Sequence, residues 1–211
     1  MPSNRRRRAT TFVISMAAAT FLGMRVWLAA ERLGSVTASL SFLSHFFTIL
    51  TNTAIFIFMT MAAWGVTIPP RISLALASAI LGVGLVYHVA LKHLLHLPPG
   101  LPTISDQGVH TVIPIMTLFW WIAFEQQQQT LPFSAAVSSV VWPLVYCLYI
   151  LARANLSEQV FYPYPFLNLA EIGNAQFVVN VVCLGGVFAG LGALLLLLQR
   201  SVRSLLKEKE S

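Results

Sequence analysis

Thr48 and His110 are the two side chains of this 211-residue chain whose chemistry fits together most directly. A threonine hydroxyl is a weak nucleophile and needs a general base to take its proton, which a histidine within hydrogen-bond reach does near neutral pH. Each residue alone has an ordinary structural explanation, because threonines commonly bond to helix backbones and histidines are often satisfied by water. At similar depth on two helices that can be neighbours, the two residues predict a nucleophile–base pair.

Other polar side chains are expected near this pair. Asp106 precedes His110 by four residues and could orient its ring, although a role as a first-turn acid of its helix is favoured. Pro114 cannot donate to the His110 carbonyl and should bend the helix there. His45 is a competing base, and Asn52, His88 and Asn180 could donate a hydrogen bond to an oxyanion. Arg25 and Lys92 could hold a carboxylate or snorkel to the interface. Tyr164 belongs to an aromatic loop.

The composition places these residues in a membrane. Hydrophobic residues make up 57% of the chain and charged residues only 9%, whereas soluble domains have roughly 45–50% and about 25%. A helix needs about 20 mostly apolar residues to cross a hydrocarbon core of roughly 30 Å. The sequence therefore predicts an all-α, polytopic membrane protein, built as a six-transmembrane-helix bundle. The predicted helices cover 10–30, 42–64, 72–95, 106–125, 133–153 and 174–199.

The basic residues are placed as a topology signal. Arg5 to Arg8 precede the first helix, and Arg200, Arg203, Lys207 and Lys209 follow the last. The positive-inside rule then predicts that the tails 1–9 and 200–211 are both cytoplasmic and flank one transmembrane domain, 10–199. We expect the multi-pass protein in the plasma membrane, with lipids and no nucleic acid as partners. The apolar stretch 10–30 is longer than that of a signal peptide and is predicted to remain as a helix.

Polar residues gather in the half of the bundle that this topology places outside. At about 100° per residue, Ser41, His45, Thr48 and Asn52 would form one stripe on the second helix. The same stripe continues inward as apolar residues, among them Ile55. The pattern predicts a cavity that opens toward the outer leaflet and is closed below, which is not the pattern of a channel.

Three segments resemble the androgen-induced protein family. They are Phe46-Phe47-Thr48-Ile49, Gly108-Val109-His110-Thr111 with Pro114 following, and Tyr162-Pro163-Tyr164-Pro165-Phe166-Leu167, in the family's order. Members are six-span membrane hydrolases with a threonine nucleophile and a histidine, and animal members cleave fatty acid esters of hydroxy fatty acids. The resemblance implies that Thr48 is the nucleophile and His110 the base of a lipid-ester hydrolase. The chain's shorter loops and arginine run indicate a bacterial branch.

Other functions remain open at this point. Two of His45, His88 and His110 could hold a haem, and a non-enzymatic lipid-binding or transport protein would also carry apolar helices. A rhomboid-like protease is discounted, because the chain lacks a Gly-x-Ser-Gly segment. We predict no metal, since the histidines near the end of the third helix lack carboxylate or cysteine partners, and no cofactor. The 162–167 segment is either an aromatic interface belt or a lid over the cavity.

Overall fold

The computed structural model describes residues 4–124, 131–156 and 161–208, and these residues form helices and connecting turns without a strand. The α-helices are α1 (Asn4–Leu33), α2 (Val36–Leu43), α3 (Phe47–Ala63), α4 (Pro70–Val86), α5 (Leu101–Gln107), α6 (Ile113–Phe124), α7 (Ser138–Leu156) and α8 (Leu169–Glu208). Two π-helical turns, Tyr87–Leu91 and Gly108–Val112, and 3-10 turns at Lys92–Leu94, Phe133–Val137 and Pro165–Leu167 complete the described elements.

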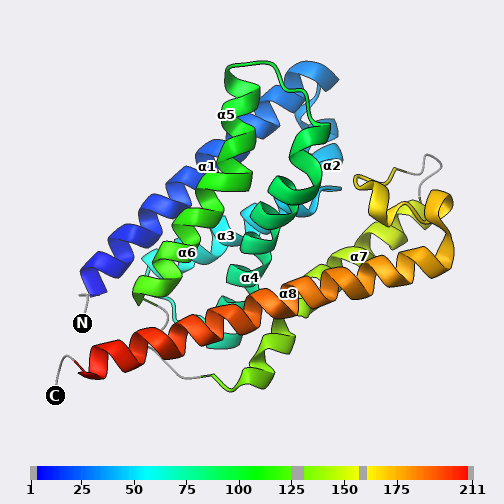
Figure 1. Cartoon of the computed structure of the whole chain (residues 1–211). Coiled ribbons are helices and arrows are strands. Elements are labelled where there is room, and N and C mark those ends of the chain that lie inside the picture. Colours follow the sequence, from blue (N-terminus) through cyan, green and yellow to red (C-terminus); the bar gives the residue numbers. More distant parts are fainter. Residues whose placement is uncertain (1–3, 125–130, 157–160, 209–211) are drawn as a thin grey trace.

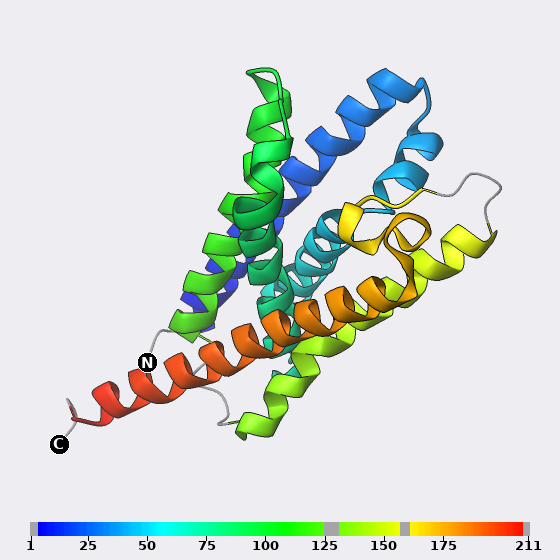
Figure 2. The ribbon, with the colours of Figure 1, turned by 45° about the vertical axis from the view of Figure 1, so that its right-hand side comes forward.

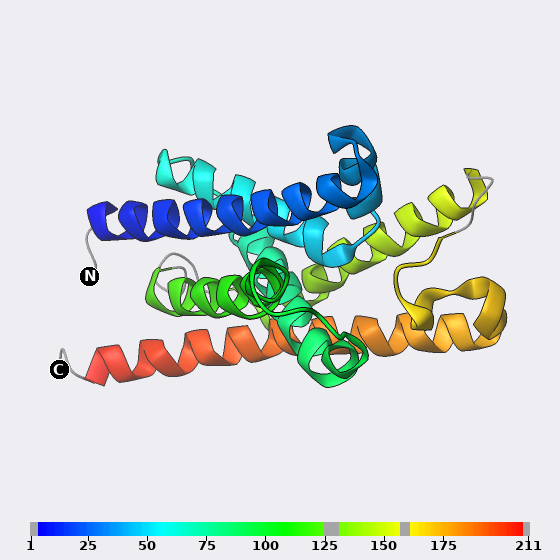
Figure 3. The same cartoon turned by 90° about the horizontal axis from the view of Figure 1, so that it is seen from above.

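The helices are long and apolar enough for a membrane bundle. Five helical segments could each cross a bilayer, and α2 with α3, bent by 101° at the break between them, could form a sixth, broken span. Both termini lie at the same end of the bundle (Figure 1), which requires an even number of crossings and therefore favours six. Seen from above, α1 and α8 lie on opposite sides, with α4 and α6 between them (Figure 3). The predicted all-α polytopic bundle is confirmed.

Large apolar side chains cover the outside of this bundle. Leu148 on α7 and Val182 on α8 are each 67% exposed, and Phe119 on α6 is equally open. Exposed apolar surface on this scale is unfavourable in water and suits contact with lipid tails. Because α7 and α8 pack along each other at the side remote from α1 (Figure 2), their outer faces continue the same lipid-facing surface. The chain is a multi-pass membrane protein.

The second span differs from the single helix expected over 42–64. The Ser44 hydroxyl donates to the Ser41 carbonyl at 2.7 Å, and the His45 ring donates to the Phe42 carbonyl at 3.0 Å, so short-range polar bonds compete with helix continuation. Phe46 is extended (φ −91°, ψ 124°), and the His45 carbonyl accepts a bond of 2.7 Å from the Tyr146 hydroxyl. The predicted four-residue stripe is therefore wrong, because Ser41 and His45 precede α3.

The ends of the other helices lie close to the predicted ends or extend beyond them. Helix α1 begins at Asn4, within the predicted N-terminal tail, and α8 continues through part of the predicted C-terminal tail. Arg8 donates to the Trp64 carbonyl at 3.1 Å, which fixes the end of α3 beside the start of α1. Above this end, α3 buries Ile55, Phe58 and Met59 in the main apolar core. The half of the bundle that carries the termini is thus packed with apolar side chains, as expected.

The predicted bend beside His110 takes the form of a π-helical turn. Pro114 has no N–H group for the α-helical bond to the His110 carbonyl, and the backbone widens over Gly108–Val112 just before it. The absent side chain of Gly84 lets the His110 carbonyl approach α4, because a Cβ there would lie 3.1 Å from that oxygen. Gly108 similarly leaves room for the Phe21 ring of α1. The widened turn is therefore held between α1 and α4. Single π-helical turns of this kind are frequent at functional sites.

Candidate active site

Thr48 and His110 meet inside the bundle. Thr48 is the second residue of α3, His110 lies in the π-helical turn before α6, and their Oγ1 and Nε2 atoms are 3.2 Å apart. Thr48 is 7% exposed and His110 8% exposed, so the histidine is not an interfacial residue bonded mainly to water. The contact joins residues 62 positions apart in the chain. The expected approach of the hydroxyl and the imidazole is present.

The other ring nitrogen determines the direction of this hydrogen bond. His110 Nδ1 lies 3.0 Å from the backbone carbonyl of Asp106. Because a carbonyl oxygen can only accept, Nδ1 must carry the proton in this bond. In the neutral imidazole, Nε2 then has the free lone pair and accepts the Thr48 proton. The histidine is thus held in the tautomer that a general base requires.

Asp106 also contacts the histidine through its carboxylate. Its Oδ1 lies 3.3 Å from His110 Nδ1, and its Oδ2 accepts a hydrogen bond of 2.5 Å from the Tyr87 hydroxyl. The Arg25 guanidinium is 3.7 Å from Oδ1. The role as a first-turn acid that was favoured from the sequence is wrong, because α5 begins at Leu101 and places Asp106 in its second turn, where it is 2% exposed. Thr48, His110 and Asp106 form a continuous chain of polar contacts.

Tyr87 is the residue of this cluster that sequence reasoning missed. Its ring stacks on the His110 ring with the centroids 4.0 Å apart, and Gln107 donates to its hydroxyl at 3.2 Å. The stacking fixes the plane of the imidazole while the hydroxyl fixes Asp106. No motif distinguishes Tyr87 from other aromatic residues, because its role depends on the packing of α4 against the π-helical turn.

Asn52 supports the site from below. Its side-chain amide donates to the Thr48 carbonyl at 2.8 Å and to the Val109 carbonyl at 3.1 Å. Asn52 is fully buried, so these bonds connect α3 to the π-helical turn at the level of the two reacting groups. Both amide hydrogens are used in this connection. Asn52 therefore positions Thr48 and His110, and it is not available as the oxyanion donor suggested from the sequence.

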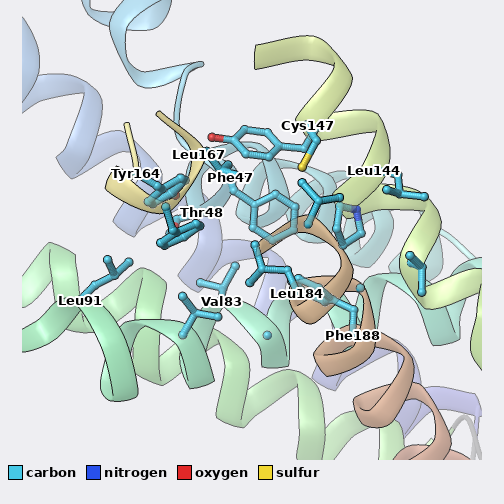
Figure 4. Close-up of a pocket in the computed structure, with 18 residues that line it drawn as sticks. Phe47, Thr48, Val83, Leu91, Leu144, Cys147, Tyr164, Leu167, Leu184 and Phe188 are labelled. Atoms are coloured by element: carbon cyan, nitrogen blue, oxygen red, sulfur yellow. The ribbon is translucent and has the colours of Figure 1, made fainter. Parts of the chain in front are cut away.

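Two cavities meet at Thr48. One is apolar, has an empty volume of about 610 Å³ and lies among α3, α4, α7 and α8 (Figure 4). The other, here called the polar cavity, has an empty volume of about 720 Å³. Most of its lining is also apolar, but it includes the charged and polar groups Arg25, Asp106, Tyr87 and His110. Thr48, Leu91 and Tyr164 line both. The nucleophile candidate thus stands at the junction of an apolar space and a polar one.

Tyr164 covers this junction from the segment between α7 and α8. It is 8% exposed, and Figure 4 shows it beside Thr48. Burial raises the pKa of the Tyr164 hydroxyl, and polar contact with the Thr48 side chain only partly opposes the rise. The hydroxyl therefore stays protonated at neutral pH and can donate a hydrogen bond. This position agrees with the lid interpretation of the 162–167 segment rather than with an interface belt alone.

Three of the candidates lie away from the pair. The His45 ring bonds to Phe42 and faces Phe161 edge-on. His88 contacts the Thr111 hydroxyl at 2.9 Å and is exposed, and Asn180 donates to the Phe166 carbonyl at 2.8 Å. None of the three lines either cavity. Because His45 and His88 have separate partners, the geometry does not support a haem held by two of these histidines. Among the described residues no group of three or more histidine, cysteine or acidic side chains could hold a metal ion.

The resemblance noted in the sequence predicts ester hydrolysis by this pair, and on that hypothesis the Asp106→Asn variant should lose about one to two orders of magnitude in rate. In serine proteases the corresponding change costs about 10⁴, because the histidine adopts the wrong tautomer. Here the Asp106 backbone carbonyl still accepts the Nδ1 proton at 3.0 Å, so the tautomer survives and only the charge is lost. Initial rates on a chromogenic ester measure the change. Glu31→Gln, at an exposed acid of α1, is the control; an Asp106→Asn rate equal to that of the control would remove the carboxylate from the mechanism.

Searches of protein-family models, curated proteins and solved structures found no match to this chain.

Proposed function

We propose that the protein is an integral-membrane hydrolase that cleaves a lipid or fatty-acid ester, with Thr48 as the nucleophile and His110 as the general base. The observation that carries the proposal is the 3.2 Å contact from Thr48 Oγ1 to His110 Nε2. The bond from Nδ1 to a backbone carbonyl leaves Nε2 as the acceptor. This is also the function that the resemblance to the androgen-induced protein family implies.

The proposed reaction proceeds in two steps. His110 Nε2 takes the Thr48 proton as Oγ1 bonds to the ester carbonyl carbon, and collapse of the tetrahedral intermediate breaks the bond to the alcohol oxygen. The same nitrogen returns the proton to the departing alcohol. Water then attacks the acyl-threonine, His110 takes the water proton, and the acid leaves as Thr48 recovers its hydrogen. Asp106 stabilises the charged imidazolium of both steps.

The oxyanion of each tetrahedral intermediate needs a donor. The sequence offered Asn52, His88 and Asn180, but all three are bonded elsewhere. Tyr164, whose hydroxyl is protonated, is buried beside Thr48 and lines both cavities. We assign it this role. The lid segment would then complete the site when substrate is bound.

The position of the site suits a substrate that enters from the outer leaflet. Thr48 lies 15 residues from Ala63, the last residue of α3, which at 1.5 Å per residue is about 23 Å along the helix. With cytoplasmic termini, this length supports a position for Thr48 in the outer half of a core of roughly 30 Å. An amphipathic ester in that leaflet can reach the site sideways without crossing the bilayer. We propose the plasma membrane as its location.

Labelling with a fluorophosphonate tests the enzyme directly. The probe phosphonylates an activated hydroxyl and releases fluoride, and tandem mass spectrometry then identifies the modified residue. We expect the modification on Thr48 of the protein in lipid nanodiscs, together with hydrolysis of a long-chain 4-nitrophenyl ester. Modification at another residue would exclude Thr48 as the nucleophile. If the wild-type protein is not modified by the probe and leaves the ester intact, it is not a hydrolase of this kind.

The apolar cavity favours one second candidate, a lipid-binding protein without catalysis. Its lining carries no formal charge and consists mostly of aliphatic and aromatic side chains, which suits an apolar ligand. Such a protein would bind a fatty acid or its ester and release it unchanged. Turnover of a bound ester, followed as free acid by mass spectrometry, separates this candidate from the hydrolase.

A further inference from the structure

The two cavities differ in their access to the general base. His110 lines the polar cavity and not the apolar one, while Thr48 lines both. This inference rests on the proposed hydrolase, in which the departing alcohol oxygen must take its proton from His110 Nε2. The alcohol part of the ester must therefore lie on the side of the polar cavity. The acyl carbon bonds to Thr48, which lines both cavities, so the acyl chain must extend into the apolar cavity.

The charges of the two cavities agree with this division. Arg25 and Asp106 line the polar cavity, whereas the residues that line the apolar cavity carry no formal charge. A hydrocarbon chain loses no hydrogen bonds in the apolar cavity and buries its surface there. An alcohol with polar substituents meets Arg25 and the hydroxyl of Tyr87 in the other. We propose that the apolar cavity is the acyl-chain site and that Phe188 sets the length of acyl chain it accepts.

The position of Phe188 follows from the directions of the helices. Helix α8 runs toward the end of the bundle that carries the termini, and Phe188 is its last residue in the cavity lining. Helix α4 runs the opposite way, and Gly82 is its first lining residue. Phe188 and Gly82 therefore lie at the end of the apolar cavity that is nearer to the chain termini. Thr48, Leu91 and Tyr164 mark the other end, and Figure 4 shows them across the cavity from Phe188.

Phe188 is fixed at this end. Its ring occupies the space that a side chain at Gly82 would need, since a Cβ there would overlap the ring. It also packs edge-on against Phe47, with the centroids 5.6 Å apart, and is 4% exposed. An acyl chain that extends from Thr48 toward the termini thus contacts the Phe188 ring, which its neighbours hold in place. Removal of the ring would open the cavity further along α8.

Hydrolysis of two ester series tests the division. One series varies the acyl chain of 4-nitrophenyl esters, and the other varies the alcohol chain of butyrate esters. With Phe188→Ala we expect the preferred acyl length to increase by two or more carbons and kcat/KM for the longest acyl chains to rise about tenfold. The preferred alcohol length should not change. A shift in the alcohol series, or in neither series, would overturn the proposal.

Two further variants keep the test independent of folding. Gly185 lines the same cavity, where a Cβ would only touch Val140 at 3.5 Å, so Gly185→Leu should shorten the preferred acyl chain. Phe119 is the matched control, because it lies on the outside of α6, is 67% exposed and lines neither cavity. Phe119→Ala should leave both length preferences as in the wild type. If Gly185→Leu leaves the preferred acyl length unchanged, the assignment of the cavity is wrong.

Photocrosslinking separates this proposal from the hydrolase itself. The probe is a 4-nitrophenyl ester of a fatty acid with a diazirine at its methyl end, bound to Thr48→Ala protein that cannot turn it over. We expect crosslinks at the end of the cavity formed by Gly82, Gly185 and Phe188. Crosslinks near Leu95 or Pro163, which line the polar cavity, would reverse the division. This result does not depend on turnover, so a protein that hydrolyses no ester would contradict the proposed function alone.

Discussion

Replacement of Thr48 by alanine is expected to lower ester hydrolysis by about three orders of magnitude or more, because the acyl-enzyme cannot form without the hydroxyl. The residual rate would come from binding and oxyanion stabilisation. Initial rates and fluorophosphonate labelling of protein in nanodiscs measure the loss. Thr48 is the second residue of α3, and its side chain lies between two cavities. Shortening this side chain to that of alanine should therefore leave the fold intact.

Two variants provide the comparison for Thr48→Ala. Thr48→Ser keeps the hydroxyl and should retain measurable hydrolysis and labelling. Thr53→Ala changes a threonine of the same helix whose hydroxyl donates to the Ile49 carbonyl at 2.8 Å, and it should behave as the wild type. Undiminished labelling of Thr48→Ala would exclude the assigned nucleophile, whatever the activity of the two comparison proteins.

Replacement of His110 by glutamine is expected to lower hydrolysis by about 10²- to 10⁴-fold, the usual contribution of a general base. Glutamine can still form a hydrogen bond with Thr48 but cannot accept its proton. The same loss is expected for His110→Ala, which leaves a space beside Thr48. Added imidazole should restore part of the rate to His110→Ala and none to Thr48→Ala, as measured by hydrolysis of a short-chain ester.

His88→Ala is the matched control for His110. It removes a histidine whose ring bonds to Thr111 outside the cavities, so its rate should remain within about twofold of the wild type. The double variant of Thr48 and His110 should be no slower than Thr48→Ala alone, because the two groups act in the same steps. Multiplication of the two losses would show that His110 acts independently of Thr48 and would refute the pair.

The lengths and charges of the helices could be read from the sequence because lipid leaves few alternatives. A bilayer core requires about 20 apolar residues in helical form, so composition alone indicated the spans. The break between α2 and α3 was missed, since Ser44, His45 and Phe46 carry no glycine or proline signal. It depends on side chains bonding back to α2 and on Tyr146, which comes from α7. Such long-range partners are invisible to local periodicity.

The site shows the same division between what is local and what is distant. The sequence by itself determined a membrane protein with a hydroxyl and an imidazole in separate apolar segments, because residue type and hydrophobicity belong to each position. It also placed Asp106 one turn before His110, since a helix brings residues four apart together. Only the tertiary structure decided which groups touch: Tyr87 on His110, Arg25 near Asp106, and Phe188 at the end of the apolar cavity. These contacts join different helices, and their geometry follows from how side chains pack between helices rather than from spacing along the chain.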